Sequence, residues 1–126
     1  MSQFIGRIYR LIGNNHFYYG STVNTLQERF YQHQSNLFGS KQLVHLFYNS
    51  IGWENVSIEL ISETIYTSRT ELLHDENSYI MNYYNDPLCL NTKLAIKCHT
   101  FVPTIDKTLL PTETMALFIT YIKSLD

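Results

Sequence analysis

Apolar and polar positions alternate from Ile5 to Ile12, as they do in a strand with one buried face. The turn cluster Gly13-Asn14-Asn15 follows, and the aromatic run His16-Phe17-Tyr18-Tyr19 comes directly after it. Two short strands around such a cluster are typical of a β-hairpin. We therefore expect the chain to begin with a hairpin, and we expect a third strand over residues 56–61, where the alternation returns.

Three further stretches place apolar residues at helical spacing, namely 24–35, 42–50 and 68–85. Asn24 with Gln27, and Ser68 with Glu71, form capping-box patterns at which two of these helices can begin. Gly52 can end the middle helix. The order strand, strand, helix, helix, strand, helix predicts an α/β fold in which helices flank a small three-stranded, mostly antiparallel sheet.

The length of 126 residues corresponds to a single domain with a short appendage. We expect residues 1–95 to form the main body, and residues 96–126 to form a connector followed by a last helix over about 112–124. The apolar stripe of that helix consists of Met115, Phe118, Ile119 and Ile122. Such a stripe docks on the core or joins two subunits, so we expect a monomer or a weak homodimer.

The chain has no N-terminal pattern of a signal peptide and no run of about eighteen apolar residues. We therefore expect an intracellular, soluble protein of the cytoplasm or nucleus with no membrane partner. Cys89 and Cys98 are the only cysteines, and we interpret them as reduced structural thiols. A zinc site that includes His99 would have at most three ligands without a recognised spacing.

The formal net charge of −2 argues against general nucleic-acid affinity, but it hides a gradient along the chain. Residues 1–53 carry four lysine or arginine side chains and one glutamate, a net charge of +3. Residues 54–86 carry one arginine and seven acidic side chains, a net charge of −6. The basic part would face phosphates while the acidic part faces water, although a random scatter explains the charges equally well.

Hydrolysis of a phosphodiester needs a base to activate water, a metal ion, and a cation near the phosphate. Tyr9 and Tyr18 lie on the two strands of the predicted hairpin. Arg29 and His33 are four residues apart and would share one helix face. Glu76 lies on the predicted helix 68–85. Each of these residues taken singly is more typical of a core or surface position, so their spacing alone does not establish a site.

Four segments contain these residues, and a fifth, Cys89-Leu90-Asn91, follows them along the chain. The four are Arg7-Ile8-Tyr9, Tyr18-Tyr19-Gly20-Ser21-Thr22, Leu26–His33 and His74–Ile80. In this order they resemble the motifs of the GIY-YIG nuclease family, over roughly residues 4 to 95. Two positions depart from the pattern in the family name. Arg7 stands where that name has glycine, and Tyr19 stands where it has isoleucine.

The resemblance implies that residues 1–95 are the catalytic domain of a DNA endonuclease. One divalent metal, Mg²⁺ or Mn²⁺, would bind Glu76, and water would attack the phosphodiester without a covalent intermediate. Tyr9 or Tyr18 would hold or deprotonate that water. A phenol titrates near pH 10, so the phenolate would need cations such as Arg7, Arg10 or the metal.

The family resemblance also implies the residues that contact the substrate. Arg29 would bind the scissile phosphate with its planar fork, and His33 would bind phosphate or assist proton transfer. Asn91 would position Glu76 or the product strand. The other expected substrate contacts are Arg7, Gly20, Ser21 and Lys41, with Lys41 or His45 taking the place of a basic residue that some relatives have.

Two alternatives stay open beside the nuclease hypothesis. The chain could be a catalytically inactive DNA-binding module that keeps the fold, or a protein-interaction domain that uses its tyrosine-rich hairpin. Residues 96–126 contain no DNA-reading motif, so we expect DNA as the partner and a separate DNA-targeting protein as a source of specificity. The sequence leaves open whether cleavage serves DNA repair, recombination, or the spread of a mobile element or virus.

Overall fold

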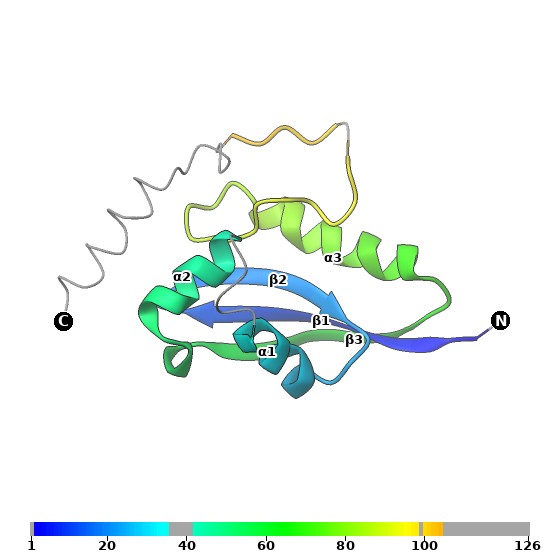
Figure 1. The fold of residues 1–126 in the computed structure, drawn as a ribbon. Helices are drawn as coiled ribbons and strands as arrows, with labels where there is room; N and C mark the ends of the chain where they lie inside the picture. The colour runs from blue at the N-terminus through cyan, green and yellow to red at the C-terminus, as the bar shows by residue number, and fades with distance from the viewer. Residues whose placement is uncertain (1, 36–41, 99, 105–126) are drawn as a thin grey trace.

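The described residues of the computed structural model, 2–35, 42–98 and 100–104, fold around one antiparallel sheet (Figure 1). The sheet has three strands in the order β2-β1-β3, so β1 is central. The strands are β1 (Phe4–Gly13), β2 (His16–Thr22) and β3 (Ser57–Tyr66). The three-stranded antiparallel sheet predicted from the sequence is therefore confirmed.

The hairpin of β1 and β2 turns at Asn14 and Asn15, whose φ angles are 51° and 64°. Asparagine adopts this left-handed conformation readily, and a two-residue turn of this kind matches the twist of paired strands. Strand β3 is longer than the predicted 56–61. It continues to Tyr66 because its polar second half still pairs with β1, with a register shift where Ile8 gives way to Tyr9 along β1.

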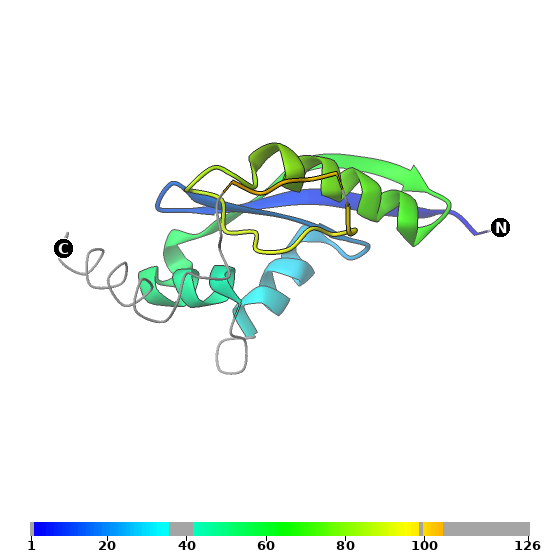
Figure 2. The same cartoon turned by 90° about the horizontal axis from the view of Figure 1, so that it is seen from above.

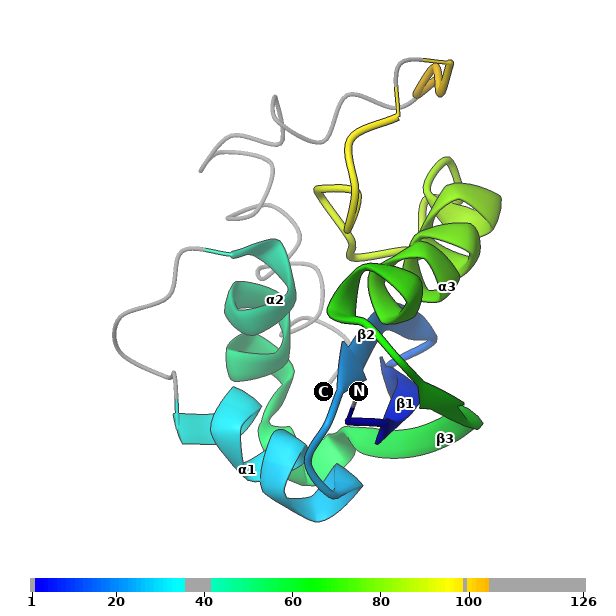
Figure 3. The ribbon, with the colours of Figure 1, turned by 90° about the vertical axis from the view of Figure 1, so that its right-hand side faces the viewer.

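Helices cover both faces of the sheet (Figure 3). One face carries α1 and α2, and the other carries α3. The helices are α1 (Leu26–Ser35), α2 (Leu43–Ile51) and α3 (Arg69–Tyr83), and a 3-10 turn (Trp53–Asn55) precedes β3. The predicted α/β fold with helices flanking the sheet is confirmed.

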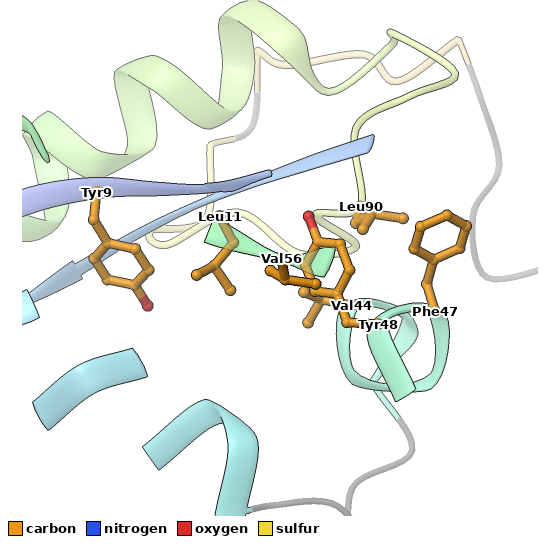
Figure 4. Close-up of a cluster of buried hydrophobic side chains, with 7 residues drawn as sticks. All are labelled: Tyr9, Leu11, Val44, Phe47, Tyr48, Val56 and Leu90. Carbon is orange, nitrogen blue, oxygen red and sulfur yellow. The ribbon is translucent and has the colours of Figure 1, made fainter. Parts of the chain in front are cut away.

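Neighbouring residues of β1 enter different cores, as side chains of a strand must. Tyr9 and Leu11 belong to the core under α1 and α2, which Figure 4 shows in close-up. Its other buried members are Val44, Phe47, Tyr48, Val56 and Leu90. Ile8 belongs instead to the core under α3. The position of a residue in β1 therefore determines which of the two cores its side chain enters.

Capping residues mark the ends of the three helices. Ser68 accepts a hydrogen bond from the backbone N–H of Glu71, so the predicted cap of α3 is confirmed. The predicted cap of α1 is wrong by one residue. The hydroxyl of Thr25, not the side chain of Asn24, accepts from the N–H of Glu28 at 3.1 Å. The φ angle of 90° at Gly52, directly after α2, suits a residue without a side chain.

After α3 the chain returns beside β2. Cys89 forms a parallel bridge with Phe17. Residues 96–98 and 100–104 then run back along α3 (Figure 2), where Phe101 packs against Tyr84. Both cysteines are free thiols. The predicted helix 112–124 with its apolar stripe, and the question of subunit association that depends on it, lie outside the described residues.

Within the part of the chain that the structure describes, no helix combines the length and the apolar character needed to cross a membrane.

Candidate functional site

The hydroxyl of Tyr9 is the centre of the candidate site. The Tyr9 side chain is fully buried, and its hydroxyl points from the sheet toward α1 (Figure 4). It accepts a hydrogen bond from Nε of Arg29 at 3.0 Å and lies 2.7 Å from Nε2 of His33. The guanidinium carbon of Arg29 is 5.9 Å from the centre of the Tyr9 ring. Three of the predicted catalytic residues are thus one hydrogen-bonded cluster.

Helix α1 carries both hydrogen-bond partners of Tyr9, and its packing on the core positions them. Leu26 and Phe30 pack on the core under α1 and α2, so the helix presents a fixed face to the sheet. Arg29 and His33 are four residues apart and follow the same face, as predicted. Arg29 also donates to the side chain of Gln32 at 3.1 Å, which holds the guanidinium near the surface.

His45 joins the cluster from α2. Its Nε2 lies 2.9 Å from Nδ1 of His33, and the two residues are only 4% and 3% exposed. The sequence suggested His45 only as a substitute for a basic substrate contact, because α2 and the hairpin are far apart in the chain. A histidine at a buried position of a predicted helix was the one signal for it.

Gly20 provides the space that the Tyr9 ring occupies. It is the cross-strand partner of Tyr9 in the hairpin. A Cβ at Gly20 would lie 2.5 Å from Cζ of Tyr9 and 3.0 Å from Cε1, which is too close for any packed pair. The glycine that we expected to contact substrate therefore has a steric task, which is to leave room for the Tyr9 ring beside β2.

We predict that Gly20→Ala displaces Tyr9 and destabilises the fold by about 1–3 kcal/mol, the usual cost of overpacking a core. Urea unfolding measures this loss. In a Tyr9→Leu background, which lacks the ring end that collides, the same substitution should cost clearly less. An equal cost in both backgrounds would show that the collision with Tyr9 is not the cause.

Glu76 approaches the same region from the opposite side of the sheet. Its Oε1 accepts a hydrogen bond from the hydroxyl of Ser21 on β2. Glu76 and Tyr18 line one pocket, with a cavity volume of about 190 Å³, together with Asn91. Neither of the two ion pairs of the described residues involves Glu76. The partly buried carboxylate therefore has no ion-pair partner among the described residues, although the charges of Arg29 and Arg69 act on it.

Burial raises the pKa values of Glu76, Tyr18 and Tyr9. It raises the pKa of Glu76, which the Ser21 hydrogen bond and the charge of Arg29 only partly oppose. Burial and then the charge of Glu76 raise the pKa of Tyr18 to about 12. Burial also raises the pKa of Tyr9, while Arg29 lowers it. Both phenols are thus neutral at physiological pH in the protein alone.

The expectation that Arg7 and Arg10 favour a phenolate is wrong. Arg10 forms an ion pair with Glu59 at 2.6 Å and interacts with Tyr19, on the face opposite to Tyr9. Arg7 pairs with Glu63 at 2.9 Å, and it also donates to the backbone of the α1 entry loop. The cation that acts on the Tyr9 hydroxyl is Arg29.

Two other predicted substrate contacts have different outcomes. Asn91 is buried, and its amide both accepts from the N–H of Tyr19 at 2.9 Å and donates to the C=O of Tyr19 at 2.8 Å. These bonds tie residues 88–91 to β2 and thereby shape the wall of the pocket, while a contact with substrate stays a prediction. Lys41 lies outside the described residues.

His33 predicts how stability depends on pH. Burial first, then the charges of Arg29 and His45, lower the pKa of His33 to about 3. Between pH 3 and the unfolded value of about 6.5, the unfolded chain binds a proton at this residue that the folded chain does not. Stability should therefore fall as the pH falls, by about 2 kcal/mol between pH 7 and pH 5.

The test replaces His33 by glutamine, which has no titrating ring. Urea unfolding at several pH values should show a flatter acid dependence for His33→Gln than for the wild type. His74→Gln is the matched control, since His74 is exposed on α3. If His33→Gln keeps the wild-type slope, another group causes the acid sensitivity.

Comparison of the chain with protein-family models, with curated proteins and with solved structures returned no match. Within the described residues, no three histidine, cysteine, aspartate or glutamate side chains gather into a group that could hold a metal ion.

Proposed function

We propose that this chain is a metal-dependent DNA endonuclease of the GIY-YIG type, which hydrolyses phosphodiester bonds by activated water. The observation that carries the proposal is the Tyr9 hydroxyl held between Arg29 and His33, beside a pocket that contains Tyr18 and Glu76. A buried phenol with a cation and an imidazole on its oxygen is a costly arrangement for packing alone. It suits a group that exchanges protons next to an anion.

The surroundings of Glu76 fit a divalent cation. The carboxylate is desolvated and has a raised pKa, and its one hydrogen-bond donor among the described residues is the Ser21 hydroxyl. Mg²⁺ typically binds one or two carboxylates, keeps several waters and takes phosphate oxygens as further ligands. Glu76 would hold such an ion, which supplies positive charge to a phosphate oxygen as negative charge develops there.

The side chains of this chain account for the remaining chemistry. Arg29 would bind the scissile phosphate with the N–H groups that Tyr9 and Gln32 do not occupy, because a guanidinium has five donors. A phenol oxygen would take a proton from the attacking water. Tyr9 is better placed for this task than Tyr18, because His33 stands 2.7 Å away to receive the phenol proton.

A cleavage panel tests the proposal. Plain, nicked and branched DNA would be incubated with the protein and Mg²⁺ or Mn²⁺, and the products separated on denaturing gels. We expect new ends that depend on the metal and on Glu76. Salt-sensitive DNA binding without any cleavage would instead identify a binding module, and the absence of both at low salt would favour a protein-interaction domain.

A further inference from the structure

Tyr9, His33 and His45 form a continuous chain of hydrogen-bonding atoms through the core. The Tyr9 oxygen and Nε2 of His33 are 2.7 Å apart, and Nδ1 of His33 and Nε2 of His45 are 2.9 Å apart. This series of hydrogen bonds begins at Tyr9 on β1, passes through His33 on α1 and ends at His45 on α2. All three side chains are buried, so bulk water does not compete for these bonds.

The hydrogen bond from Arg29 determines which atoms donate and which accept from Tyr9 to His45. A guanidinium only donates, so the Tyr9 oxygen accepts from Nε of Arg29. Among the described residues, the acceptor within reach of the phenol proton is Nε2 of His33. The proton of neutral His33 must then sit on Nδ1, where it can only be donated to Nε2 of His45. Both histidines are thereby assigned the form with hydrogen on Nδ1.

The charges around the chain determine where an added proton is least costly. His33 faces Tyr9 on β1, Tyr18 on β2, His45 on α2 and, from its own helix, Arg29. The charge of Arg29 lowers the pKa of both histidines, and the charge of His45 further lowers the pKa of His33. A second positive charge on His33, directly beside the Arg29 and Tyr9 pair, is therefore poorly tolerated. Transfer to His45 moves that charge one ring farther away.

We propose that His45 is the terminal acceptor of a two-histidine proton relay that carries the Tyr9 phenol proton away from the site. The inference rests on the proposed nuclease function. The Tyr9 O–H bond breaks as an Nε2–H bond forms on His33, and the His33 Nδ1–H bond breaks as an Nε2–H bond forms on His45. The products are a phenolate, a neutral His33 and a protonated His45, so the total charge is unchanged. The phenolate then accepts the proton of the attacking water.

His45 is a positioning residue in this scheme, since it acts through His33 and does not touch the substrate. The informative substitution is His45→Gln, because the glutamine oxygen can still accept from Nδ1 of His33 but cannot become protonated. We expect kcat for DNA cleavage to fall about 10-fold with little change in KM. This is less than the roughly 10²–10⁴-fold contribution of a general base itself.

The pH profile separates a relay from a purely structural role. In the wild type, kcat should fall as the pH drops through the pKa of His45, because a protonated ring cannot accept from His33. His45→Gln should lose this acid limb. The matched control is His16→Gln, since His16 is also buried against Phe47 but lies outside the chain of hydrogen bonds. This control should keep the wild-type profile.

A second measurement does not depend on activity. ¹⁵N chemical shifts of the imidazole rings in the metal-free protein should show protonated Nδ1 and bare Nε2 for both His33 and His45. A proton on Nε2 of His45 at neutral pH would overturn the relay, since that atom could not then accept.

The two measurements keep the relay distinct from the function on which it rests. If the wild type cuts DNA in a Glu76-dependent manner and His45→Gln keeps both rate and pH profile, the relay is wrong and the nuclease stands. If the wild type does not cut DNA, the nuclease proposal fails, and the catalytic use of the relay fails with it, whatever the ring nitrogens show.

Discussion

Glu76→Gln should reduce DNA cleavage by about 10³-fold while leaving the fold intact or more stable. A metal ion contributes several kcal/mol to stabilising charge in the transition state, and each tenfold in rate corresponds to about 1.36 kcal/mol. The amide has nearly the shape of the carboxylate and can still accept from the Ser21 hydroxyl. The amide carries no charge, so the substitution removes the negative group that we propose as the metal ligand.

The expected gain in stability follows from the sign of the pKa shift. Burial raises the pKa of Glu76 above its unfolded value, so the folded state holds its proton more tightly than the unfolded state. This contribution favours folding at low pH and is lost as the pH rises through the folded pKa. At neutral pH the buried charge costs stability, and glutamine avoids that cost. Urea unfolding without metal should therefore give Glu76→Gln at least the wild-type stability.

Asp75→Asn is the matched control for charge. Asp75 neighbours Glu76 on α3, but its side chain accepts from the hydroxyl of Tyr66 at 2.6 Å, away from the pocket. This variant changes the net charge by the same amount and should cut at the wild-type rate. Thermal unfolding with Mn²⁺ adds a further readout, since a bound metal raises Tm only where it has a site. A Glu76→Gln protein that still cuts like wild type would contradict the metal assignment.

The local pattern of the sequence was sufficient to predict the three strands, the three helices and their order. The alternation in β1, the asparagine turn and the capping pair of Ser68 with Glu71 each act within a few residues, so the sequence alone reveals them. The second half of β3 was missed for a different reason. Ser62, Glu63 and Thr64 are not apolar, and they form strand only because β1 provides paired backbone groups for them.

That missed half of β3 also explains the error over Arg7. Its partner Glu63 lies beyond the predicted end of the strand, so the ion pair that occupies Arg7 could not be anticipated. The error over Arg10 was avoidable. Arg10 directly follows Tyr9 in a strand, and adjacent residues of a strand point to opposite faces. A cation at that position could not reach the Tyr9 hydroxyl.

The site was predictable where its members share one element and not where they meet across the fold. Arg29 and His33 follow from helical spacing, and the steric relation of Gly20 to Tyr9 requires the hairpin register. The pairing of His33 with His45 depends on how α1 and α2 pack against the sheet. No local pattern encodes that packing, because it is set by which side chains fill the shared core.

Arg29→Lys should lower kcat/KM for DNA cleavage by about 100-fold, although the charge is kept. Arg29 donates at once to Tyr9 and to Gln32, and a guanidinium still has N–H groups left for two phosphate oxygens. A lysine ammonium has three donors on a flexible stem and cannot hold this planar arrangement. Loss of one positioned donor to developing charge typically costs about 10²–10³-fold. Steady-state kinetics on a short duplex measures the change.

Comparison of three variants separates the geometry of Arg29 from its charge. Arg29→Ala removes both, Arg29→Lys removes only the planar fork, and Arg10→Lys makes the same exchange on the opposite face, where Glu59 is the partner. If the fork matters, Arg29→Lys will cut nearly as poorly as Arg29→Ala, while Arg10→Lys cuts like wild type. If Arg29→Lys instead keeps most of the activity, Arg29 acts as a point charge, and the fixed geometry around Tyr9 serves the phenol rather than the phosphate.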